Sequence, residues 1–117
     1  MTIIQLIVDA HGCEGPLNDA ATLLARMEAA ARAAGAQTVG QAQARYVPHG
    51  VTAIVFLAES HILISTWPEY RLALVDILLC NPRMDPEGVW DRLARTLRPA
   101  GEVRIRRSER QVGATPE

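Results

Sequence analysis

Residues 46–70 decide the fold, and they read YVPHGVTAIVFLAESHILISTWPEY. Two apolar runs, 51–57 and 62–66, flank the polar triplet 59–61, and a second polar cluster follows at 65–69. Apolar runs of this length that are rich in β-branched residues are typical of buried strands. We therefore expect two antiparallel strands joined by a tight turn, which places the polar triplet at one end of a sheet.

The remaining elements follow from hydrophobic pattern and from residues that start or stop helices. Apolar runs and alternations predict further strands over 2–9, 37–46, 72–80 and 103–106. Helical spacing of apolar residues predicts a helix over 17–34, capped by Asn18 and ended by Gly35, and a second over 86–97, opened by Asp85 and Pro86. Most strands are consecutive, so we expect an α+β fold: a two-layer sandwich of a mostly antiparallel sheet with both helices on one face.

A chain of 117 residues fits one domain. We assign residues 1–107 to this domain and expect a disordered tail over 108–117, which has no apolar face to bury. The sheet face away from the helices is also apolar in 51–57 and 72–79, so pairing with a second copy of the chain is expected.

Composition excludes several classes of function. Apolar residues make up 49% of the chain and the formal net charge is −1, which indicates neither nucleic acid nor an anionic membrane as a partner. The chain has no Lys, which excludes lysine Schiff-base chemistry. The two cysteines, Cys13 and Cys80, lack metal-ligand spacing, so no metal site is expected. The start resembles no signal peptide and no apolar run reaches membrane-spanning length, so we expect a cytoplasmic protein.

Three residues have ordinary structural explanations. His49 sits in a Pro-Gly turn, where exposure is expected, and Cys13 is expected to be structural. Asp76 lies inside an apolar strand, where an unpaired charge is costly, so a partner such as an Arg is expected.

Two longer sequence motifs point to a known family. LAESH at 57–61 and TWPEY at 66–70, with Gly50-Val51 before them and Cys80 after, closely resemble the bacterial-type S-adenosylmethionine decarboxylase proenzymes. The first strand and its exit loop, up to Cys13, are also similar, so the resemblance spans roughly residues 3–107.

This resemblance implies a self-cleaving zymogen. The hydroxyl of Ser60 attacks the carbonyl carbon of Glu59, an ester forms, and β-elimination cuts the chain between the two residues. Ser60 becomes a covalent pyruvoyl group, which forms a Schiff base with the amine of S-adenosylmethionine as this lyase releases carbon dioxide. The implied role is in polyamine biosynthesis, on the route to spermidine.

Further residues acquire roles from the same resemblance. Cys80 matches the thiol that reprotonates the substrate carbon, and Thr52 matches a hydroxyl that assists processing. Glu69 matches a carboxylate that holds the ribose hydroxyls, and Tyr46 matches an aromatic ring that stacks on adenine from the other subunit. A homodimer with the active site near its interface is therefore implied.

The chain departs from the family at Ser65, where a histidine serves both as the base in processing and as the second face of the adenine site. Gln5 is a second departure, again at a position where histidine is common. His61, His49 or a water could replace the missing base. Two alternatives stay open: a pyruvoyl-dependent arginine or ornithine decarboxylase on the same scaffold, and an unprocessed paralogue that acts as a binding or regulatory partner.

Overall fold

The computed structural model describes residues 1–58, 60–81 and 83–113. Over these residues the elements follow in the order β1 (Thr2–Ala10), α1 (Ala20–Ala33), β2 (Thr38–Arg45), β3 (Val51–Leu57), β4 (Ser60–Trp67), the 3-10 turn η1 (Pro68–Tyr70), β5 (Leu72–Leu79), α2 (Pro86–Leu97) and β6 (Val103–Gln111). Every strand and helix expected from the sequence is present.

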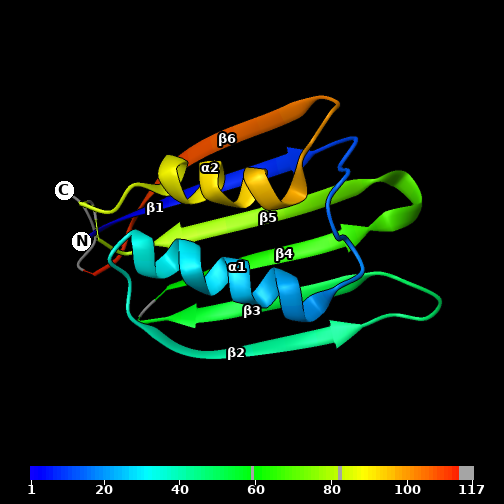
Figure 1. Cartoon of the computed structure of the whole chain (residues 1–117). Coiled ribbons are helices and arrows are strands. Elements are labelled where there is room, and N and C mark those ends of the chain that lie inside the picture. The colour runs from blue at the N-terminus through cyan, green and yellow to red at the C-terminus, as the bar shows by residue number, and fades with distance from the viewer. Residues whose placement is uncertain (59, 82, 114–117) are drawn as a thin grey trace.

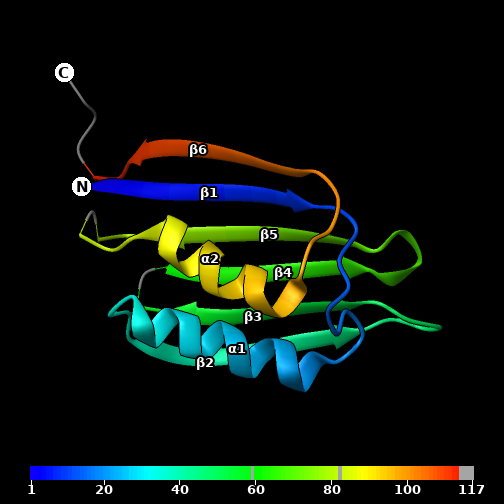
Figure 2. The ribbon, with the colours of Figure 1, turned by 45° about the horizontal axis from the view of Figure 1, so that its top comes forward.

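The strands form one six-stranded sheet in the order β2-β3-β4-β5-β1-β6, in which each neighbouring pair is antiparallel. Figures 1 and 2 show α1 and α2 side by side on one face of this sheet. Helix α1 packs against β2 and β3, and α2 packs against β5 and β1. The expected two-layer α+β sandwich is therefore confirmed. Neither described helix has the length and hydrophobicity that a membrane span requires.

Alternation along the central strands separates the two faces of the sheet. In β3 and β5 every second side chain is buried beneath the helices, so these side chains form the sheet side of the hydrophobic core. The intervening side chains point to the other face, which no helix of the described residues covers. Large apolar side chains on this open face are Ile54, Phe56, Leu63, Leu74 and Leu78.

The start of α1 differs by one residue from the expected cap. Asp19, rather than Asn18, caps the helix: its carboxylate accepts hydrogen bonds from the backbone N–H and the hydroxyl of Thr22, at 3.1 and 2.7 Å. These bonds lower the pKa of Asp19, with the side-chain bond from Thr22 as the main cause. Asn18 instead accepts a hydrogen bond from the Gly50 N–H at 2.8 Å, so it fastens a distant turn. Gly35 follows the helix with φ of +85°, as expected.

The last strand is longer than expected. Residues 108–111, assigned from the sequence to a disordered tail, belong to β6, which pairs with β1 from Ala10↔Val103 to Thr2↔Gln111. This edge strand is held by backbone hydrogen bonds while nearly all its side chains remain exposed, so it lacks the apolar signal on which the boundary was drawn. Residues 114–117 lie outside the described residues.

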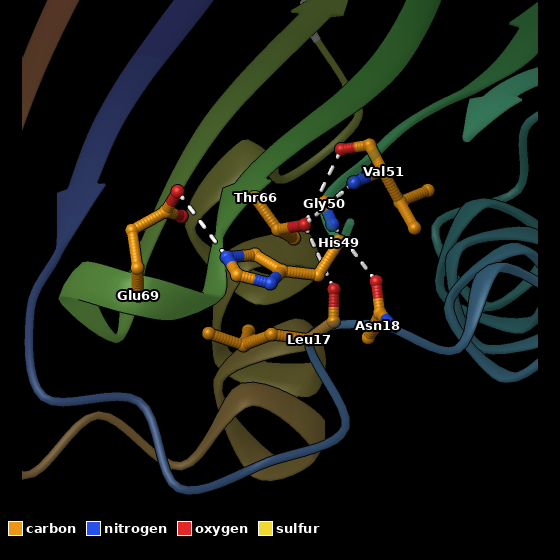
Figure 3. A network of polar contacts seen from close by, with 7 residues as sticks. All are labelled: Leu17, Asn18, His49, Gly50, Val51, Thr66 and Glu69. Atoms are coloured by element: carbon orange, nitrogen blue, oxygen red, sulfur yellow. Dashed lines mark hydrogen bonds and ion pairs between the residues drawn. The ribbon is translucent and has the colours of Figure 1, made fainter. Parts of the chain in front are cut away.

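One buried hydroxyl joins three segments of the chain (Figure 3). Thr66, near the end of β4, is only 4% exposed. Its hydroxyl donates to the Leu17 carbonyl at 2.8 Å and accepts from the Val51 N–H at 2.9 Å. Thr66 thus ties the segment before α1 to the start of β3.

Replacing Thr66 by Val should destabilise the protein by about 2–4 kcal/mol, because an isosteric side chain leaves a buried N–H and a buried carbonyl without partners. Urea unfolding monitored by circular dichroism measures this loss. Thr66→Ser keeps the hydroxyl and loses only a methyl group, so it should cost about 1 kcal/mol. Equal losses in the two variants would contradict the role given to the hydroxyl.

Candidate active site

The first group of predicted site residues lies where β3, β4 and β5 meet at one end of the sheet. The hydroxyl of Ser60, the first residue of β4, lies 3.4 Å from the Ala58 carbonyl oxygen and 4.0 Å from the Cys80 sulfur. The Cys80 thiol also contacts the Ala58 carbonyl, at 3.4 Å. Ser60 and Cys80, which the sequence resemblance predicts to be the nucleophile and the proton donor, therefore lie next to each other. Glu59, the other residue of the expected cleavage bond, lies outside the described residues.

The second group lies at the opposite end of the same strands. The Tyr46 hydroxyl is 2.9 Å from the Thr52 hydroxyl, which in turn is 3.3 Å from the Ser65 hydroxyl. Thr52 and Ser65 are directly opposite each other in the β3–β4 ladder. These side chains line a hollow of about 410 Å³, whose remaining lining residues are His49, Thr66, Trp67 and Glu69.

Glu69 borders this hollow from η1, and it has a partner that was missed in the sequence. The His49 Nε2 lies 3.3 Å from the Glu69 Oε2, and Figure 3 shows the imidazole directed at the carboxylate. The pairing register of β3 with β4 could have predicted this contact. Because Thr52 is opposite Ser65, residues 49 and 68 lie across from each other beyond the strand ends.

The two groups are far apart within one chain. Ser60 and Ser65 are separated by five residues of a continuous strand, which at about 3.3 Å per residue corresponds to roughly 17 Å. A single chain therefore brings Ser60 together with Cys80, and Tyr46 together with Thr52, Ser65 and Glu69, but it does not join the two groups.

His61 lies on the open face of the sheet, away from both groups' contacts. Its Nε2 is 3.6 Å from the Asp76 Oδ2, and the Gln5 amide donates to both Asp76 carboxylate oxygens at 3.1 and 3.3 Å. The expectation of an Arg partner for Asp76 was wrong: the amide and the imidazole take that place, because Gln5 and His61 are on the strands adjacent to Asp76.

The surroundings of Cys13 fit the structural role that was expected for it. Its side chain is 3% exposed and its thiol donates to the Ala10 carbonyl at 3.4 Å. Burial raises the pKa of the Cys13 thiol, which disfavours the reactive thiolate. Over the described residues no group of three or more His, Cys, Asp or Glu could hold a metal ion.

Comparison with known proteins shows the family of the chain. The family model described as S-adenosylmethionine decarboxylase matches residues 4–111. An S-adenosylmethionine decarboxylase proenzyme of Thermotoga maritima is 33% identical over 107 residues, which cover 91% of this chain and 82% of the relative. One from Acidithiobacillus ferrooxidans is 37% identical over 100 residues, covering 85% of this chain and 74% of the relative.

A solved structure extends the likeness to three dimensions. The adenosylmethionine decarboxylase from Aquifex aeolicus superposes with a TM-score of 0.78 at 26% identity, over 98% of this chain and 93% of that one. The chain thus has the fold of an adenosylmethionine decarboxylase. It belongs to the S-adenosylmethionine decarboxylase family, and the resemblance found in the sequence is confirmed.

Proposed function

We propose that the chain is a proenzyme that cleaves itself between Glu59 and Ser60 and then decarboxylates S-adenosylmethionine, for spermidine biosynthesis in the cytoplasm. The observation that carries this proposal is the contact of the Ser60 hydroxyl with the Cys80 thiol at the end of the sheet, within a chain of this family. The names of the relatives support this substrate, and none of the relatives described above is named for arginine or ornithine.

Ser60 suits the formation of a pyruvoyl group because its hydroxyl is placed at the first residue of β4, next to the expected cleavage bond. When present, such a group supplies an electrophilic carbonyl that accepts the electrons released as a carboxylate leaves. The Cys80 sulfur lies 4.0 Å from the Ser60 oxygen, a position that suits a thiol for protonating the substrate carbon. Thr52 and Ser65 form a hydroxyl pair that we assign to processing or substrate binding, with His61 as a further candidate base.

We further propose that the active form is a homodimer in which each site draws on both chains. Two observations support it. The open face carries apolar side chains, among them Phe56 at 42% exposure, and such a face is a natural surface for a second copy. A second copy that lies on this face in the opposite orientation brings the Ser60 end of one chain against the Tyr46 and Glu69 end of the other. The two groups of site residues, roughly 17 Å apart within one chain, would then meet across the interface.

Release of labelled carbon dioxide from carboxyl-labelled S-adenosylmethionine tests the activity. We expect release from this substrate and none above background from labelled arginine or ornithine at equal concentration, because the relatives are named for S-adenosylmethionine. Turnover of arginine or ornithine alone would assign the scaffold to the alternative substrates. A chain that remains whole and releases nothing would instead support the non-catalytic paralogue.

A further inference from the structure

The contact between His49 and Glu69 has no role in the function proposed so far. Nε2 and Oε2 are 3.3 Å apart, with the two side chains 35% and 44% exposed. Both residues line the hollow that also contains Tyr46, Thr52 and Ser65. Glu69 is the one acidic residue of that lining, so it is the anionic acceptor available to a ligand there.

The Glu69 carboxylate has little else to orient it. It projects from the short 3-10 turn Pro68–Tyr70, and over the described part of the chain His49 is its one ion-pair partner. A carboxylate without such a partner samples several rotamers, and fixing it on binding costs conformational entropy. Contact with the imidazole restricts it beforehand.

His49 can do this because its own backbone is anchored. Gly50, the next residue, donates its N–H to the Asn18 side chain at 2.8 Å (Figure 3). The Gly50 carbonyl accepts from the Tyr46 N–H at 2.9 Å. Gly50 has φ of +108°, and an added Cβ would lie 3.3 Å from the Thr66 carbonyl oxygen, so the turn needs glycine here. The imidazole therefore comes from a fixed turn rather than from a free loop.

We infer that His49 is a positioning residue for substrate recognition: its imidazole holds the Glu69 carboxylate ready to accept hydrogen bonds from the hydroxyl groups of a cationic, hydroxylated ligand. The neighbouring hydroxyls of Tyr46, Thr52 and Ser65 are neutral and contact one another, so the carboxylate is the strongest acceptor that the hollow offers a ligand. The inference rests on the proposed function, since the ligand class is that of a sulfonium nucleoside. It adds a residue whose effect is exerted entirely through Glu69.

Steady-state kinetics with S-adenosylmethionine tests this role. His49→Ala should raise KM about three- to tenfold and leave kcat and the extent of self-cleavage unchanged, because the carboxylate loses its orientation but no reacting group changes. His49→Gln keeps an N–H donor and should recover part of the loss. His11→Ala, at an exposed histidine that does not line the hollow, is the matched control and should behave as the wild type. Slower self-cleavage in His49→Ala would identify His49 as a base for processing and overturn the inference.

A double-mutant cycle separates action through Glu69 from direct contact with the ligand. If His49 acts through the carboxylate, the double variant His49→Ala/Glu69→Ala should have the KM of Glu69→Ala alone, whereas multiplicative increases in KM would overturn the inference. The nitrogen-15 resonance of His49 Nε2 gives a readout that needs no turnover: it should shift on Glu69→Gln, and an unchanged resonance would show that the pair does not interact. Failure of the wild type to decarboxylate S-adenosylmethionine, with that shift present, would remove the proposed function and leave the pair established.

Discussion

The Ser60→Ala variant is expected to remain one chain of 12.8 kDa, whereas the wild type should separate under denaturing conditions into fragments 1–59 and 60–117. Alanine has no hydroxyl to attack the preceding carbonyl, so neither the ester nor the β-elimination that follows it can form. The effect should be complete, because the lost group is the nucleophile itself. Gel electrophoresis and intact mass measure it directly, and the mass of the second fragment reports whether residue 60 carries a pyruvoyl group.

Ser108→Ala is a suitable control for this experiment. It makes the same substitution at an exposed position of β6, which strands β5 and β1 separate from β4, and it should cleave at the wild-type rate. Cleavage of Ser60→Ala at the same bond would refute Ser60 as the nucleophile. A wild type that stays whole would refute the proenzyme proposal.

The second large effect is complementation between two chains that are each nearly inactive at substrate concentrations below KM. Ser60→Ala lacks the reacting residue, and Glu69→Ala lacks the carboxylate at the other end of the sheet. If each site draws on both chains, a mixed dimer combines the intact Ser60 of one chain with the intact Glu69 of the other and so restores one complete site. With equal expression and random pairing, half of the dimers are mixed and about one quarter of all sites are complete.

Co-expression should therefore give about one quarter of the wild-type rate, measured at substrate concentrations below KM, while each variant alone gives almost none. Mixing the two separately purified variants without subunit exchange is the control, and it should give no gain. Activity after co-expression that does not exceed the sum of the separate variants would place the whole site in one chain and overturn the composite arrangement.

The sequence predicted best those elements whose buried side chains form a clear apolar pattern. Strands β3 and β5 were clear because their apolar runs are interrupted only by Thr52 and Asp76. Helix α2 was clear because Asp85 and Pro86 mark its start. The end of β6 was not clear from the sequence, because an edge strand is stabilised by its backbone hydrogen bonds while its side chains stay exposed. Asn18 and Asp19 are both good helix caps, and the sequence alone offers no distance by which to choose between them.

The sequence pointed to the individual residues of the candidate site, but it did not predict how they are arranged in space. Ser60 and Cys80 are 20 positions apart, and only the pairing of β4 with β5 shows that their strand ends coincide. The distance from Ser60 to Glu69 required strand β4 to be continuous, which converts nine positions of sequence into opposite ends of a sheet. Asp76 was correctly expected to have a partner, but strand order determined that Gln5 and His61 fill that place.

The strand order has a consequence for a chain that is cut between residues 59 and 60. The first piece contributes β1, α1, β2 and β3, and the second contributes β4, β5, α2 and β6. In the sheet, β1 of the first piece lies between β5 and β6 of the second, so the pieces are interlaced rather than merely adjacent. Separating them would break three ladders at once, β3 with β4, β5 with β1 and β1 with β6. We therefore expect the fold to tolerate loss of the peptide link at the hairpin, so that a two-piece molecule would keep the shape of the one-piece chain.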